Sequence, residues 1–234
     1  MNFLNNTEKT GLSGNFLKII ALITMTIDHV GLELFDNMLI MRIIGRIAFP
    51  IFAYMIAEGC TYTRNRRKHL LTIALLAFLC QAVYFVAMNS LYQCILVTFS
   101  LSVALIYSID NAIKNRTFIS VIVCVLTVSL IAYTALVLPV TLAKTDYGID
   151  YGIFGVLLPV LVYFARTKEM KLAAFTVGLS LVCYDFGGIQ WYSLLTVPLI
   201  ALYNGKRGRL KLKNLFYIYY PLHLVIIHFI GVLL

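Results

Sequence analysis

The sequence has little charge and no polar segment long enough to form a soluble domain. Only 12% of its 234 residues are charged and 61% are hydrophobic, whereas a soluble domain is about a quarter charged and about half apolar. The longest mainly polar stretches are residues 1–15 and 204–214. The first of them lacks the apolar core and small-residue cleavage site of a signal peptide, so we expect no removed leader. These absences predict a single integral-membrane domain over residues 1–234.

Cysteine motifs and acidic side chains are scarce as well. The five cysteines are odd in number, and no two have the Cys-x-x-Cys spacing of metal or redox sites. We therefore expect no metal ion and interpret the cysteines as small buried residues. Basic residues outnumber acidic ones by 19 to 10, but basic loops in a membrane protein set its topology. We expect membrane lipid around the chain and no nucleic-acid partner.

Apolar runs of about 20 residues predict membrane-spanning helices. The sixth to eighth runs are short, so the expected number is nine, give or take one, and the expected fold class is an all-α polytopic membrane helix bundle. The runs cover residues 16–35, 38–60, 69–88, 91–109, 118–140, 151–165, 170–184, 189–203 and 215–234.

Loop charges predict the orientation of these helices. With nine spans, most basic residues fall before helix one or in the loops after helices two, four, six and eight, all on one side. The loops on the other side contain Lys144 as their only basic residue, together with several aspartates. The positive-inside rule then predicts a cytoplasmic amino terminus and an external carboxyl terminus.

Apart from Lys18 and Glu58 near their cytoplasmic ends, the first two predicted helices contain four charged residues and one histidine: Asp28, Glu33, Arg42, Arg46 and His29. In an antiparallel hairpin Glu33 lies at about the depth of Arg42, and His29 at about the depth of Arg46. A charge near the bilayer centre costs at least ~2.5–3.5 kcal/mol, and such residues mark functional sites by default. A purely structural ion-pair clamp is the alternative, although a clamp needs only one pair.

Two features beside these charges indicate an irregular helix. Pro50 cannot donate the hydrogen bond that would reach the Arg46 carbonyl, so the helix should bend there. Gly45 permits a close backbone approach. Such breaks are tolerated in membranes where they line a cavity.

The last predicted helix contains a second polar group of residues. Pro221 interrupts its hydrogen bonds, and His223 lies about ten residues from the cytoplasmic end, near mid-membrane at ~1.5 Å per residue. His228 lies deeper, and Tyr219 and Tyr220 approach the membrane core. For each histidine alone, a packing role and a functional role are both open.

The predicted cytoplasmic loop TYTRNRRKH follows Glu58 and contains Arg64, Arg66 and Arg67. The simple interpretation of this loop is a topology signal. The functional interpretation is a docking surface for a phosphorylated cofactor, because the arginine fork matches phosphate oxygens.

These segments, in order, resemble the TraX family: LKIIALITMTIDHVG, RIIGRIAFPIFAYMIAEGCTYTRNRRKHLL, LYNGKRG and FYIYYPLHL. The most specific parts are Asp28-His29, the run Gly45 to Pro50, and Glu58-Gly59. The resemblance implies acetylation of pilin-type amino termini, within a broader group of membrane acyltransferases that use cytoplasmic acetyl-CoA. The early-helix histidine that is central in that group falls on His29. The resemblance does not identify the acceptor of this protein, which is a protein amino terminus or a glycan.

The resemblance and the charged residues together predict an acetyl-CoA-dependent acyltransferase. We expect His29 to act as general base, with Asp28 or Glu33 orienting it and Glu33 favoured by helical spacing. Arg46 is expected to stabilise negative charge on the thioester oxygen, and His223 to carry a second proton or accept the acyl group. The predicted cofactor-binding residues are Arg42, Glu58, Arg64, Arg66 and Arg67.

Two other classes of protein remain alternatives. In a proton-coupled transporter, Asp28, His29 and Glu33 would relay protons, although such proteins often show duplicated halves and this sequence shows none. In a non-catalytic scaffold the intramembrane charges would serve assembly alone.

Overall fold

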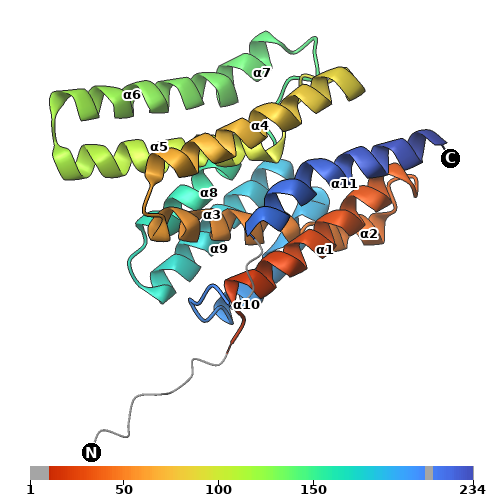
Figure 1. Ribbon diagram of the computed structural model, residues 1–234, viewed down its shortest axis with the longest axis horizontal. Coiled ribbons are helices and arrows are strands. Elements are labelled where there is room, and N and C mark those ends of the chain that lie inside the picture. The colour runs from red at the N-terminus through yellow and green to blue at the C-terminus, as the bar shows by residue number, and fades with distance from the viewer. Residues whose placement is uncertain (1–10, 209–212, 234) are drawn as a thin grey trace, which may run out of the picture. The chain divides into compact units, whose positions relative to one another are not determined.

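The computed structural model describes residues 11–208 and 213–233, which form helices and two isolated β-bridges (Figure 1). Each of the nine expected ranges overlaps a helix or an interrupted helix, with bounds that differ by up to several residues. The elements are α1 (Gly14–Glu33), α2 (Leu39–Gly45), α3 (Ala48–Tyr62), α4 (Arg66–Met88), α5 (Ile95–Asn115), α6 (Phe118–Ala132), the π-helix η1 (Tyr133–Val137), α7 (Leu138–Thr141), α8 (Gly152–Phe164), α9 (Lys168–Phe186), the 3-10 helix η2 (Gly188–Leu195), α10 (Thr196–Ala201) and α11 (Lys213–Leu233).

Polar residues mark the beginnings of four helices. The side chains of Ser13, Asn65, Thr117 and Thr167 each accept a hydrogen bond from the backbone N–H three residues later. These caps satisfy N–H groups that the first helical turn leaves without a partner. They explain why α1, α4, α6 and α9 begin where they do.

A turn that contains Asp36 and Asn37 joins α1 to α2. Asp36 and Asn37 have φ angles of 45° and 61°, and short polar side chains of this kind tolerate the left-handed region. The turn makes α1 and α2 an antiparallel hairpin. Gly31 permits their close packing, because a β-carbon there would lie 2.5 Å from the Met41 β-carbon.

The second expected span is interrupted rather than merely bent. The helix α2 ends at Gly45, Arg46 and Ile47 form a turn, and α3 begins at Ala48. Pro50 thus lies in the first turn of α3, where its missing N–H removes no helical hydrogen bond. A helix irregularity was expected at this place, but the break itself lies before the proline.

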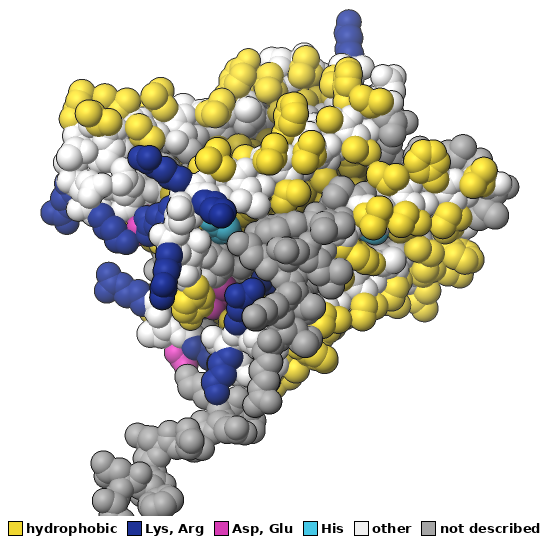
Figure 2. All heavy atoms as spheres, viewed as in Figure 1, with side chains coloured by type: hydrophobic (Ala, Val, Ile, Leu, Met, Phe, Trp, Pro, Cys, Tyr) yellow, Lys and Arg dark blue, Asp and Glu magenta, His cyan; other side chains and the backbone are white. Residues whose placement is uncertain are grey.

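Within residues 11–208 and 213–233, five helical segments are long and apolar enough to cross a membrane: residues 14–33, 39–62, 66–86, 95–115 and 118–141. Shorter apolar helices cover residues 152–164, 188–201 and 222–231. On α6, large hydrophobic side chains such as Phe118, Ile119 and Leu126 are exposed. Figure 2 shows hydrophobic side chains covering much of the visible face. These features are those of a membrane protein, because in water such a surface would drive association.

The helices form two compact units, which we call unit one (residues 1–55 and 189–234) and unit two (residues 56–188). Unit one joins the beginning and end of the chain. Leu12 accepts a backbone hydrogen bond from Asn204 at 3.0 Å and donates one to Leu202 at 2.9 Å. Figure 1 shows α11 running beside α1 in this unit, and the two helices are in contact.

Unit two is built around α5, which contacts α4, α6 and α8. Its core contains the fully buried side chains of Val103, Leu158 and Phe175. The Ser102 hydroxyl lies 2.8 Å from the carbonyl of Val156, which connects α5 to α8. In Figure 1, α6 turns back along α5 after a short connection.

Candidate functional site

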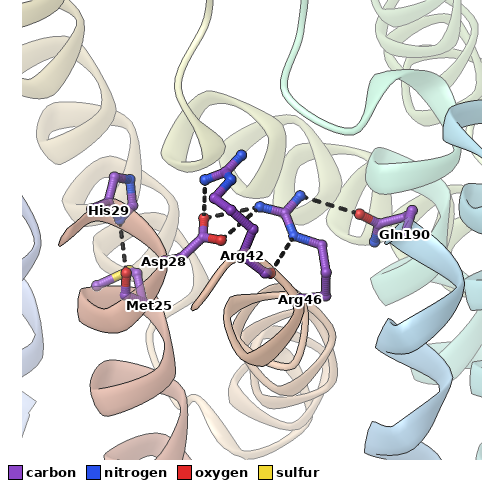
Figure 3. Close-up of polar contacts among 6 residues, drawn as sticks. All are labelled: Met25, Asp28, His29, Arg42, Arg46 and Gln190. Carbon is purple, nitrogen blue, oxygen red and sulfur yellow. Dashed lines mark hydrogen bonds and ion pairs between the residues drawn. The ribbon is translucent and has the colours of Figure 1, made fainter. Parts of the chain in front are cut away.

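An ion-pair cluster joins α1 and α2 in unit one (Figure 3). Arg42 donates from Nη1 to Asp28 Oδ2 at 2.8 Å, and Arg46 donates from Nη2 to both Asp28 oxygens at 2.9 Å. All three side chains are more than four-fifths buried. Arg46 also donates to the Arg42 carbonyl and to Gln190 Oε1, each at 3.3 Å. With two guanidinium groups and one carboxylate, the cluster carries a net charge of +1.

Matched depth in the hairpin makes Glu33 a candidate partner of Arg42, and His29 one of Arg46, but the observed ion pairs are different. Asp28 takes both arginines, while Glu33 is exposed and makes no ion pair with any described residue. Gly45 permits the close approach that was expected of it, since it packs directly against the Asp28 side chain. The carboxylate that can reach α2 is therefore the one facing Gly45.

The structure brings His29 of α1 and His223 of α11 together. Their ring centroids are 5.0 Å apart, and the ring planes meet at 79°, an edge-to-face arrangement. The Nδ1 atom of His29 lies 2.9 Å from the Met25 carbonyl oxygen, and that of His223 lies 3.0 Å from the Tyr219 carbonyl oxygen. Each ring is thus held by a carbonyl of its own helix.

These carbonyl contacts determine which ring nitrogen carries the proton. A carbonyl oxygen can only accept, so Nδ1 carries the hydrogen in both histidines and the neutral rings have their lone pair on Nε2. The Nε2 atom of His223 is buried and has no hydrogen-bond partner among the described residues. The partner of His29 Nδ1 is thus the Met25 carbonyl and not the Glu33 carboxylate. Two imidazoles therefore present basic nitrogens in one region of unit one.

Two polar residues at this site were not predicted from the sequence. Gln190 lies at the far side of Arg46 (Figure 3), and Thr26 lies against Tyr219. Gln190 is a buried amide in an apolar segment, which is a signal that sequence inspection can use. The side chain of His228, the other histidine of α11, lies outside the described part of the structure.

Arg66 of the predicted phosphate-binding loop makes contacts within unit two. Its Nη1 atom lies 2.6 Å from Asp110 Oδ2, and Lys114 Nζ lies 2.8 Å from the same oxygen. The Arg66 guanidinium also stacks over the Tyr107 ring at 5.1 Å and lies 3.4 Å from the Tyr163 hydroxyl. Arg66 therefore anchors the start of α4 to α5 and α8.

Glu58 pairs with Lys171 of α9 at 2.5 Å, and its side chain is buried. Arg64 and Arg67, in contrast, are exposed and make no hydrogen bond or ion pair with the described residues. Figure 2 shows basic side chains gathered where α4 begins and α5 ends. Of the five residues predicted to bind a cofactor, Glu58 and Arg66 thus belong to ion pairs of unit two, and Arg64 and Arg67 have exposed side chains. The fifth, Arg42, belongs to the ion-pair cluster of unit one.

The predicted site residues consequently form two separate sets. Asp28, Arg42 and Arg46 form one hydrogen-bonded cluster, and His29 lies beside Asp28 in sequence and against His223 in space. Glu58 and Arg66 belong to ion pairs of unit two.

Comparison with known proteins gives a family-level match. A profile described as TraX protein matches residues 13–231. The "Probable fimbrial assembly protein FimC, serogroup H1" of Dichelobacter nodosus is 25% identical over 90% of this chain and 92% of its own length.

An uncharacterized protein of Rickettsia prowazekii is 58% identical over 40 residues, which are 17% of this chain and 16% of that protein. The chain therefore spans about a sixth of this second relative's length. No solved structure matches the chain.

Proposed function

Because the chain belongs to the TraX family, we propose that it is a membrane acyltransferase that moves an acetyl group from acetyl-CoA to an amine or hydroxyl group at the membrane. The relative named as a fimbrial assembly protein supports a pilus subunit's amino terminus as the acceptor. The distribution of loop charge supports nine spans with a cytoplasmic amino terminus, in the inner membrane of a bacterium.

The observation that carries this proposal is the state of the His29 ring. Its Nδ1–H is engaged by the Met25 carbonyl, so Nε2 is the nitrogen that can take up a proton. A general base near neutral pH needs such a lone pair within reach of the attacking group. In the proposed reaction the acceptor nitrogen attacks the thioester carbonyl, and His29 Nε2 takes the proton that the nitrogen loses.

The charge that develops on the carbonyl oxygen requires a hydrogen-bond donor. Arg46 was expected to supply it, but both its terminal nitrogens and its Nε already donate to protein atoms. Arg42 is the better donor, because its Nε–H is buried without a hydrogen-bond partner in the described residues. The net positive charge of the cluster favours an anion there. Collapse of the intermediate breaks the carbon–sulfur bond, and the CoA thiolate receives the proton from His29.

The phosphates of CoA require cationic groups at the cytoplasmic surface. Arg64 and Arg67 fit this requirement, because their side chains are exposed and make no ion pair with the described residues. Arg66 fits it less well, since Asp110 already occupies its guanidinium group. We therefore assign Arg64 and Arg67 to CoA binding, and Arg66 to holding the loop in place.

The test is an acetyl-transfer assay with protein purified in detergent, acetyl-CoA and a synthetic pilin-type peptide with a free amino terminus. His29→Asn is the informative variant, because the asparagine amide can still donate to the Met25 carbonyl while the base nitrogen is lost. We expect thiol release and peptide acetylation by the wild type, and a loss of at least ~100-fold in His29→Asn with CoA binding retained.

Binding of CoA without any transfer by the wild type contradicts the enzymatic proposal. Proton-driven uptake by proteoliposomes without thiol release would instead support the transporter alternative.

A further inference from the structure

A hydrogen-bonded chain connects α1 to the ring that stacks on His223. The Tyr219 hydroxyl lies 2.6 Å from Thr26 Oγ1, and Thr26 Oγ1 lies 2.8 Å from the carbonyl oxygen of Leu22. A threonine hydroxyl has only one hydrogen, and the Leu22 carbonyl can only accept. Thr26 therefore donates to Leu22 and accepts the hydrogen of Tyr219.

The hydrogen bond from the Tyr219 hydroxyl to Thr26 fixes the Tyr219 ring with respect to α1. The ring lies parallel to His223, with 9° between the planes and 5.3 Å between the centroids. The Tyr219 carbonyl accepts the Nδ1–H of the same histidine. Tyr219 thus contacts His223 through both its side chain and its backbone, while Thr26 holds the side chain.

The surroundings of this contact are apolar. Tyr219 and Tyr220 pack against a buried cluster formed by Leu22, Met25 and Ala48. His223 itself is buried. The His223 ring is bound at Nδ1 by the Tyr219 carbonyl, and its Nε2 has no hydrogen-bond partner in the described residues. The Tyr220 ring also meets it edge-to-face at 5.5 Å between centroids, so the rings of Tyr219 and Tyr220 together limit its rotation about the side-chain bonds.

We propose that Tyr219 and Thr26 are positioning residues, which together hold the His223 ring edge-to-face against His29. This inference rests on the proposed function, in which His223 is the second imidazole of the site. In this proposal Tyr219 does not contact the substrate. It acts through His223, and Thr26 acts through Tyr219.

The test uses Tyr219→Phe, which keeps the stacked ring and removes the hydroxyl, and Thr26→Val, which keeps the branched shape and removes the acceptor. In the acetyl-transfer assay each variant is expected to lower kcat about fivefold, as the loss of one hydrogen bond predicts, with KM for acetyl-CoA unchanged. The double variant is expected to match the single ones, since both remove one interaction. Thr26→Ser, which keeps the hydroxyl, is expected to restore kcat.

Matched controls lie in unit two. Thr127 donates to the Val123 carbonyl as Thr26 does to Leu22, and the Tyr147 hydroxyl donates to the Thr134 carbonyl. Thr127→Val and Tyr147→Phe therefore remove the same groups within unit two, where they make these other hydrogen bonds, and kcat should stay at the wild-type value.

A readout independent of activity separates this inference from the proposed function. The chain has four histidines, so nitrogen-15 NMR of protein labelled at the histidine rings gives few signals. Tyr219→Phe and Thr26→Val should shift or broaden the His223 signals and leave those of His69 in place.

If the wild type transfers no acetyl group but the His223 signals move, the proposed function fails and the positioning role stands. If the His223 signals are unchanged in both variants, or if kcat stays at the wild-type value in an active enzyme, the positioning role is overturned.

Discussion

Gly45 packs directly against Asp28: a β-carbon built on Gly45 would overlap the β-carbon and Oδ1 of the aspartate. This contact places the carboxylate against α2, where Arg42 and Arg46 reach it. The absence of a side chain at position 45 is thus a condition for the ion-pair cluster.

Gly45→Ala should therefore destabilise the protein, although alanine favours a helix over glycine. We expect a loss of about 1–3 kcal/mol from overpacking, seen as a lower temperature of thermal unfolding in detergent. Gly231→Ala is the control, because a β-carbon on Gly231 would meet Leu34 at an ordinary 3.4 Å. Equal stability of the two variants would show that α1 and α2 can separate without cost.

The Asp28 carboxylate is the counter-charge of two arginines, so its neutralisation should lower the free energy of unfolding more than the loss of either arginine. Asp28→Asn leaves Arg42 and Arg46 side by side without a counter-charge, and we expect a loss of about 3 kcal/mol. Arg42→Gln keeps the Asp28–Arg46 pair and should cost less. Glu33→Gln, at an exposed carboxylate, should leave thermal unfolding unchanged. A larger effect at Glu33 than at Asp28 would contradict the observed pairing.

In the basic loop before α4, some residues should bind CoA and others should stabilise the fold. Arg64→Ala combined with Arg67→Ala is expected to weaken CoA binding about tenfold, since two charge-assisted contacts to phosphate are lost, without lowering the unfolding temperature. Arg66→Ala should lower the unfolding temperature, because it leaves Asp110 with Lys114 alone. Titration calorimetry and thermal unfolding give the two readouts.

Lys144→Ala is the control for this prediction, because Lys144 is exposed and lies in another loop. It should change neither CoA binding nor the unfolding temperature. Weakened CoA binding in Arg66→Ala alone would reverse the assignment of the loop residues.

Acid should weaken the contact between the loops that flank α5 and α8. The Ser90 hydroxyl and the Leu91 N–H donate to Asp146 at 2.5 Å and 2.9 Å, and these hydrogen bonds lower the pKa of its carboxyl below the usual 3.8. The folded state thus binds the proton less readily than the unfolded chain. The stabilisation is present above pH 3.8 and lost as the pH falls through the lower, folded value.

Thermal unfolding between pH 2.5 and pH 6 measures this effect. Asp146→Asn should be less stable than the wild type at pH 6, and the difference should shrink as the pH falls below 3.8. Asp185→Asn, at an exposed carboxyl in the last turn of α9, provides the comparison. A difference that does not change with pH would mean that the charge of Asp146 is not what stabilises the contact.

The proposed topology can be tested by cysteine labelling, since four of the five native cysteines are buried. Lys144→Cys should react with a membrane-impermeant maleimide in intact cells, whereas Arg116→Cys should react only after the membrane is opened. The opposite pattern would invert the proposed orientation.

The charged residues of the first two helices show which contacts could be predicted from the sequence and which could not. The positions of Asp28, Glu33, Arg42 and Arg46 in two adjacent apolar helices follow from the sequence, and so does their meeting in a hairpin. Depth matching selected Glu33 as a partner of Arg42, but it ignored the rotation of each helix about its axis. Packing at Gly31 and Gly45 fixes that rotation, and it turns Asp28 toward the arginines.

Arg66 gives a second example. Its neighbours in the sequence are basic, so the sequence predicts that it belongs to a phosphate-binding loop or to a loop that sets the membrane topology. The side chain that pairs with it, Asp110, lies at the other end of the α4–α5 hairpin in sequence. No local pattern connects two residues that meet only because their helices pack.

The sequence by itself determined the helical membrane character, the approximate extents of the helices and the presence of charge within them. Hydropathy, loop charge and turn residues act over a few neighbouring positions, so they can be read along the chain. The tertiary structure alone decided that Asp28 binds both arginines, that His29 meets His223, and that Thr26 holds Tyr219. These contacts depend on how helices distant in sequence pack and rotate against one another, which no local pattern specifies.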